Sequence, residues 1–227
     1  MNCWICGAPA DSKEHRIKAS DVRRFFGGVS RTTPIYFQGG ARPNIPVGSA
    51  KSNRLKTRNV ICVRCNDTKT AAFDRAWEAM STYVLDNWSD IKRRKSLKLQ
   101  RVFPGRTKEQ AINVQLFFAK LFGCRIVDER IPIPLTAFEK AVRAGTPHPN
   151  LYLTLTVATF DSRLSEYAAQ SEVHAVKRGG ACVRAAWYYT LGEFSVKVTW
   201  TDSTFQERSR IAWHPSRHAK IIKFETL

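Results

Sequence analysis

The chain has 227 residues, of which 43% are hydrophobic and 11% aromatic, so it can bury a sizeable core and is not intrinsically disordered. Its 37 Lys and Arg residues outnumber its 19 Asp and Glu residues, and the resulting net charge of +18 favours a polyanionic partner, nucleic acid first. The alternative to nucleic-acid binding is a basic protein whose charge only keeps it in solution. No apolar run approaches the ~20 residues of a membrane span and no signal peptide is apparent, so we expect no membrane contact and a reducing, cytoplasmic setting.

The positive charge is concentrated in the first half of the chain. Residues 1–110 contain 22 basic and 9 acidic side chains, a net charge of +13, whereas residues 111–227 contain 15 and 10, a net charge of +5. We therefore expect phosphate contacts to lie mainly in the N-terminal half.

Two C-x-x-C pairs stand out, one at the N-terminus and one near residue 60. The four cysteines are Cys3, Cys6, Cys62 and Cys65. Thiolates at this spacing converge on one tetrahedral centre, which predicts a closed, structural Zn(Cys)4 site. Closing that site would also bring the dipeptide at residues 14 and 15 close to the residue that follows the second pair.

In chain order, the first half predicts a short strand around residues 14 and 15, a helical turn over 21–26 and a Gly- and Pro-rich loop over 27–50. A second strand over 59–62 follows. Apolar residues then recur at three- and four-residue spacing from Phe73 to Ile91, which predicts one long helix with that stripe in the core.

The second half predicts a buried helix from Thr107 to about Phe122 that Gly123 ends, and a short helix over 135–144 that Gly145 ends. Alternating residues predict strands over 151–160, 181–190 and 193–201, the last two forming a hairpin near Gly192. The expected fold is α+β, with an N-terminal module that a zinc site holds together, a helical middle and an antiparallel sheet near the C-terminus. We expect the module at residues 1–100 and a second α+β domain at 101–227 for target recognition, partner binding or dimerisation.

The order CxxC, Glu14-His15, CxxC-Asn66 resembles the HNH endonuclease family, whose fold is the ββα-metal motif. The resemblance covers residues 3–74, about a third of the chain. It implies that Glu14 and Asn66 hold a catalytic Mg²⁺ or Mn²⁺ and that His15 is the general base. Glu14 replaces the more common Asp, and the Pro usually found soon after the His is absent. The family's middle Asn has two candidates, Asn59, which we prefer, and Asn53.

Adjacent residues of a regular strand point to opposite faces, so Glu14 and His15 can share a site only if a twist or bulge brings them together. The resemblance also places Lys69 near substrate phosphate. Basic residues near the expected site complete the predicted nucleic-acid contacts: Arg16, Lys51, Arg54, Lys56, Arg58 and Arg64.

These features together predict a metal-dependent endonuclease that hydrolyses DNA phosphodiester bonds, double-stranded DNA being the first choice of substrate. The sequence does not decide whether the substrate is DNA or RNA, or whether one strand or both strands are cut. The alternatives are a zinc-stabilised nucleic-acid-binding module without catalysis, and a nuclease subunit of a defence or mobile-element complex. A homodimer is compatible with each.

Overall fold

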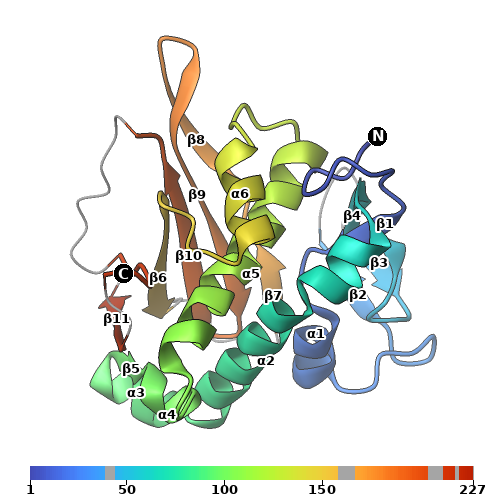
Figure 1. Ribbon diagram of the computed structural model, residues 1–227. Helices are drawn as coiled ribbons and strands as arrows, with labels where there is room; N and C mark the ends of the chain where they lie inside the picture. The colour runs from blue at the N-terminus through green and yellow to red at the C-terminus, as the bar shows by residue number, and fades with distance from the viewer. Residues whose placement is uncertain (39–43, 158–166, 204–211, 218–219, 227) are drawn as a thin grey trace.

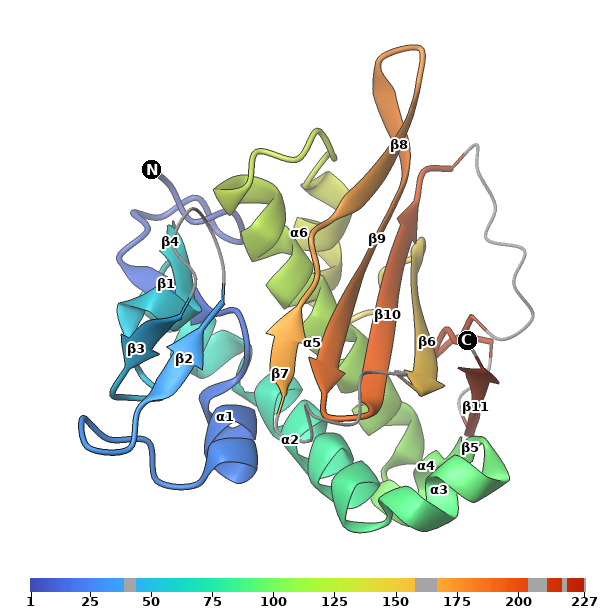
Figure 2. The same cartoon turned by 180° about the vertical axis from the view of Figure 1, so that it is seen from behind.

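The computed structural model describes residues 1–38, 44–157, 167–203, 212–217 and 220–226, and these form a mixed α+β fold, the predicted class. A seven-stranded sheet carries helices on one face, and a smaller N-terminal unit packs beside them (Figures 1 and 2). Among the described residues, no helix combines the length and apolar character that crossing a bilayer requires.

The N-terminal unit is built on one pair of strands. Its elements are β1 (Ser12–His15), α1 (Ala19–Phe26), β2 (Ile35–Phe37), β3 (Ile45–Val47), the 3-10 turn η1 (Asn53–Leu55) and β4 (Lys56–Ile61). Strands β1 and β4 pair antiparallel, and β2 pairs with β3 inside the segment predicted as a loop. Residues 39–43 of that loop lie outside the described residues.

The helix predicted from Phe73 to Ile91 is divided. A π-helical turn, η2 (Arg64–Lys69), leads into α2 (Ala71–Asp86), and α3 (Trp88–Arg94) follows a break at Asn87. The Asn87 side chain donates to the Tyr83 carbonyl at 2.9 Å, a local bond of the kind that competes with helix continuation. Most of the predicted stripe is nevertheless buried: Phe73, Ala76, Trp77, Met80, Val84 and Ile91.

The longest helix is α5 (Thr107–Asp128), which follows β5 (Ser96–Lys98) and α4 (Leu99–Val102) and precedes α6 (Thr136–Ala144). The prediction that Gly123 ends this helix is wrong, because α5 continues for five residues beyond it. Gly123 instead gives the Trp4 ring room, since a Cβ there would lie 2.5 Å from Trp4 Cζ2. Gly145 does end α6, in the left-handed conformation.

The large sheet contains β6 (Leu151–Val157), β7 (Ala168–Gln170), β8 (His174–Arg178), β9 (Ala181–Leu191), β10 (Phe194–Thr201) and β11 (Ile221–Thr226). The strand order is β5-β11-β6-β10-β9-β7, with β8 also paired to β9. The hairpin of β9 and β10 was predicted. The sheet is mixed and not antiparallel throughout, because β11 runs parallel to β6.

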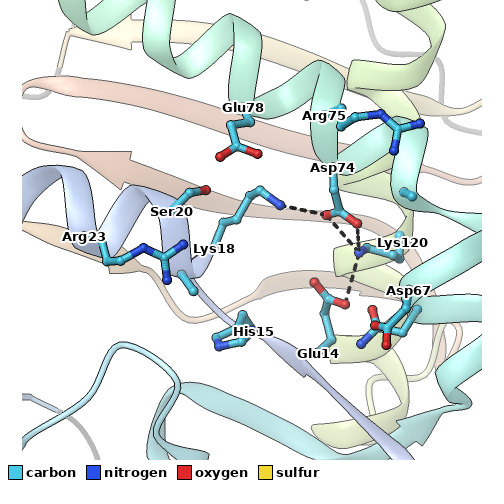
Figure 3. A pocket seen from close by; sticks show the side chains of 13 residues that line it. Glu14, His15, Lys18, Ser20, Arg23, Asp67, Asp74, Arg75, Glu78 and Lys120 are labelled. Carbon is cyan, nitrogen blue, oxygen red and sulfur yellow. Dashed lines mark hydrogen bonds and ion pairs between the residues drawn. The ribbon is translucent and has the colours of Figure 1, made fainter.

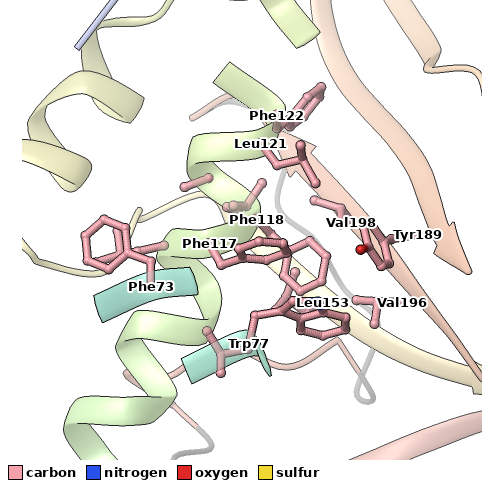
Figure 4. Close-up of a cluster of buried hydrophobic side chains, with 14 of the residues drawn as sticks. Phe73, Trp77, Phe117, Phe118, Leu121, Phe122, Leu153, Tyr189, Val196 and Val198 are labelled. Atoms are coloured by element: carbon pink, nitrogen blue, oxygen red, sulfur yellow. The ribbon is translucent and has the colours of Figure 1, made fainter. Parts of the chain in front are cut away.

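Helix α5 crosses the face of the sheet and brings the two halves of the chain into one core (Figure 4). The Trp77 ring of α2 stacks on Phe117 at 5.3 Å and meets Phe118 edge-on at 4.8 Å. It also contacts Tyr189 of β9 at 5.3 Å. The boundary predicted at residue 100 therefore falls within a continuous apolar core.

Candidate active site

The four cysteines of the two C-x-x-C pairs come together at one end of the N-terminal unit. Their sulfur atoms all lie within 4.8 Å of one another, and Cys6 Sγ lies 3.6 Å from Cys62 Sγ. Sulfurs on a tetrahedron with metal–sulfur bonds of about 2.3 Å are about 3.8 Å apart, so the cluster has the dimensions to hold a structural metal ion. A hydrogen bond from the Ala8 backbone lowers the pKa of the Cys6 thiol to about 7.

The pairing of β1 with β4 is irregular where Glu14 and His15 lie. Lys13 pairs with Asn59 and His15 with Lys56, so two residues of β4 stand opposite Glu14 alone. Such a bulge breaks the strict alternation of faces, and both side chains line the same pocket. The condition for a shared site, a twist or bulge in this strand, is therefore met.

This pocket has a volume of about 410 Å³ and lies between β1, α1, the start of α2 and α5. Figure 3 shows the polar side chains that surround it. Its lining residues are Glu14, His15, Lys18, Ala19, Ser20, Arg23, Asn66, Asp67, Ala71, Asp74, Arg75, Glu78 and Lys120. Glu14, His15 and Asn66, the three residues predicted to form the site, are all among them.

His15 is partly buried and its Nε2 atom has no hydrogen-bond partner among the described residues. Burial, and then the charge of Lys56, lower the pKa of His15 to about 4, although a hydrogen bond with the Ala50 backbone opposes this. The imidazole is thus neutral at physiological pH, and Nε2 is a buried nitrogen without a partner among the described residues.

Glu14 is buried and forms an ion pair with a lysine that the sequence analysis did not single out. Lys120 Nζ lies 3.1 Å from Glu14 Oε2 and 2.9 Å from Asp74 Oδ2. Lys18 Nζ lies 3.5 Å from Asp74 Oδ1 (Figure 3). Burial raises the pKa of Glu14, and Lys120 opposes that rise.

Lys120 itself is 1% exposed. Burial acts to lower its pKa, but the negative charges of Glu14 and Asp74 outweigh that effect and raise it. The group is therefore an ammonium shared by two carboxylates, with its charge retained inside the protein.

Asn66 lines the pocket from the turn η2. Its side-chain Nδ2 donates to Ser12 Oγ at 3.1 Å and to the Lys13 carbonyl at 3.4 Å, both on β1. These bonds orient the amide against the strand that carries Glu14. They use only the nitrogen, so the amide oxygen is the atom available to a cation.

Asn59, the preferred middle asparagine, does not belong to this site. It is exposed on β4 and does not line the pocket, and Asn53 is exposed in η1. The β4 residue that contacts the Glu14 backbone is Thr57, whose buried hydroxyl accepts a hydrogen bond from Glu14 N at 3.1 Å. The same hydroxyl donates to the Arg58 carbonyl at 3.0 Å and fills the bulge.

The predicted nucleic-acid contacts are scattered around the pocket and do not line it. Arg16 and Arg58 form ion pairs with Asp128 at the end of α5, at 2.5 and 2.8 Å, and so serve the fold. Lys56 lies opposite His15 on β4. The other predicted contacts are exposed outside the pocket: Lys51, Arg54, Arg64 and Lys69.

Sequence reasoning missed the charged residues that do line the pocket. Arg23 on α1 and Arg75 on α2 are exposed there, and neither has a carboxylate partner among the described residues (Figure 3). No local pattern marks them. Lys120 carries a usable signal, because it interrupts the apolar run 117–122 and a lysine is rarely buried unless it is paired.

In comparisons with known proteins, no protein-family model, no curated protein and no solved structure matches the chain. The chemistry of the pocket therefore rests on its own residues.

Proposed function

We propose that the protein is a metal-dependent endonuclease that hydrolyses phosphodiester bonds of nucleic acid, double-stranded DNA first, in the manner of the HNH family. One observation carries the proposal. A buried carboxylate, an amide and a neutral histidine with an unpartnered Nε2 lie in one pocket of a strongly basic protein. The order of the paired strands β1 and β4, then η2 and α2, supports the proposal of a ββα-metal motif around them.

The cysteine cluster is a structural zinc site in this proposal. Four thiolates at these separations suit zinc, and the set leaves no open position for a substrate. The zinc links the N-terminal turn to the start of η2, and so fixes Asn66 relative to β1.

Glu14 Oε1 and the Asn66 amide oxygen would hold the divalent cation, because hard cations such as Mg²⁺ and Mn²⁺ take oxygen ligands. Once bound, the cation would neutralise charge on the scissile phosphate and stabilise the leaving oxygen. His15 Nε2 would accept the proton of the attacking water. The bulge beside Thr57 keeps His15 and Glu14 at one site.

Phosphate recognition falls to different residues from those expected. Arg23 and Arg75 flank the pocket on two helices, are exposed and lack intramolecular carboxylate partners among the described residues. Guanidinium groups so placed can contact the phosphates on either side of the scissile bond.

A plasmid-nicking assay tests the proposal with Mg²⁺, Mn²⁺ or EDTA. We expect cleavage by the wild-type protein that EDTA abolishes, and a loss of roughly 10²–10⁴-fold in His15→Ala with zinc content and DNA affinity retained. A matched control is His174→Ala, because His174 is exposed on β8 outside the pocket. Undiminished cleavage by His15→Ala would refute the assignment of the base.

The second candidate, a zinc-stabilised nucleic-acid-binding module without catalysis, is favoured by the Glu14–Lys120 ion pair. In that function the pair serves only the fold, and the pocket holds no cation. Binding of one Mn²⁺ besides zinc, lost in Glu14→Gln, separates the two functions without any cleavage assay.

A further inference from the structure

Helix α5 brings a lysine into the candidate active site from a part of the chain that the HNH resemblance does not cover. Lys120 is one of the largest fully buried side chains of the protein, and its neighbours on the helix are apolar. A charge in such surroundings persists only where partners compensate its loss of hydration. Its partners are Glu14 and Asp74, both lining the pocket.

The ammonium joins three elements at one point. Glu14 comes from β1, Asp74 from α2 and Lys120 from α5, and Figure 3 shows the three side chains converging. Asp74 contacts Lys120 through both oxygens, at 2.9 and 3.0 Å, so the ammonium is anchored by Asp74 while it also contacts Glu14. Lys18 also approaches Asp74, at 3.5 Å.

The printed ion-pair contact between Lys120 and Glu14 joins Nζ to Oε2, at 3.1 Å. This contact restricts the rotation of the carboxylate and occupies Oε2, so Oε1 is the oxygen offered to another ligand. Partners of this kind behind a metal-binding carboxylate orient it, and their loss typically weakens metal binding 10–100-fold.

We propose that Lys120, anchored by Asp74, is a positioning residue that holds Glu14 for a divalent cation. This inference rests on the proposed function, since it concerns the same pocket. It makes α5 part of the active site and not only of the second half of the fold.

Mn²⁺ binding to the full-length, zinc-loaded protein tests the inference without nucleic acid, by the loss of the free-Mn²⁺ electron paramagnetic resonance signal. We expect Lys120→Met to bind Mn²⁺ 10–100-fold more weakly than wild type, with unchanged zinc content. Lys108→Met is the matched control, because Lys108 is an exposed lysine on the same helix and should bind like wild type. Lys120→Arg should regain part of the affinity.

A second variant is needed because Lys120→Met leaves two carboxylates without their counter-ion and can fail to fold. Asp74→Asn keeps the size of the side chain and removes the anchor of Lys120. It also removes the ion pair of Asp74 with Lys18, which is partly exposed. We expect the variant to remain folded and to bind Mn²⁺ several-fold more weakly. In plasmid nicking, high Mn²⁺ should restore much of the activity of these variants, whereas it should not restore His15→Ala.

Wild-type Mn²⁺ affinity in folded Lys120→Met or in Asp74→Asn would overturn the inference and leave Lys120 as a structural counter-ion. If the wild-type protein still cleaves in a His15-dependent manner, the proposed function survives that result. A wild-type protein that binds no Mn²⁺ beyond its zinc would overturn both. Mn²⁺ binding that weakens in the order wild type, Asp74→Asn, Lys120→Met supports the inference.

Discussion

The Gly123→Ala substitution tests how the cysteine cluster is docked onto α5. In the middle of an exposed helix, alanine is about 1 kcal/mol more favourable than glycine. Here a Cβ would lie 2.5, 2.6 and 2.8 Å from three carbon atoms of the Trp4 indole, which is closer than packed carbon atoms approach. The sign of the effect therefore depends on whether the ring can move.

Three contacts hold the Trp4 ring in place. Its Nε1 donates to Cys124 Sγ at 3.3 Å, its backbone nitrogen donates to the Val60 carbonyl at 3.3 Å, and the adjacent Cys3 belongs to the cysteine cluster. The residue is only 8% exposed. Because the ring cannot swing into solvent, we place the penalty near the upper end of the ~1–3 kcal/mol usual for overpacking.

Subtracting the helix gain, we expect Gly123→Ala to lower the free energy of unfolding by about 1–2 kcal/mol. The measurement is urea unfolding of zinc-loaded protein, followed by tryptophan fluorescence. Gly28→Ala is the control, since a Cβ at Gly28 meets nothing within 4 Å. In a Trp4→Leu background the clash is relieved, and the same change should be neutral or stabilising.

A Gly123→Ala protein more stable than wild type would refute this reasoning. It would mean that the N-terminal turn moves away from α5 at little cost and that Trp4 does not fix the distance between them.

Two further predictions concern the metal cluster and an unrelated buried histidine. Cys62→Ser should lose its zinc by elemental analysis and unfold the N-terminal unit by circular dichroism, because structural zinc contributes about 10 kcal/mol or more to folding; a folded, zinc-free wild type would contradict this. His148 is fully buried, and burial, followed by the charge of His214, lowers its pKa to about 4. The unfolded chain binds the proton from about pH 6.5 downward, so stability is present above that pH and falls by about 2 kcal/mol as the pH drops to about 5. His148→Asn, which keeps an acceptor for Asn150 N, should remove that part of the pH dependence in urea titrations, and an unchanged pH dependence would contradict the assignment.

Local sequence signals predicted the parts of this protein that local chemistry determines. The C-x-x-C spacing predicted a four-cysteine cluster, because each pair can form a knuckle by itself. A shared site for Glu14 and His15 required a twist or a bulge, since a regular strand directs neighbours to opposite faces, and the structure has a bulge there. Glycine at residues 145 and 192 marked a helix end and a hairpin turn correctly.

Contacts between distant parts of the chain were not predictable in this way. A glycine at residue 123 looks the same in the sequence whether it ends a helix or leaves space for the ring of Trp4, which lies 119 residues earlier in the chain. The contact of the Thr57 hydroxyl with the Glu14 backbone depends on the bulge, and the sequence does not show which of several polar residues of β4 makes it. Lys120 was conspicuous in an apolar run, but its partners are 106 and 46 residues away.

The position of α5 has a consequence for moving the proposed catalytic site into another protein. A fragment that ended at residue 100 would keep every residue of the HNH resemblance, yet it would expose the ring of Trp77 that now stacks on Phe117 and leave Glu14 without its ammonium partner. Residues 1–100 are therefore not expected to form the site by themselves. A graft onto another scaffold would have to include α5, because this helix packs against the cysteine cluster, the pocket and the sheet.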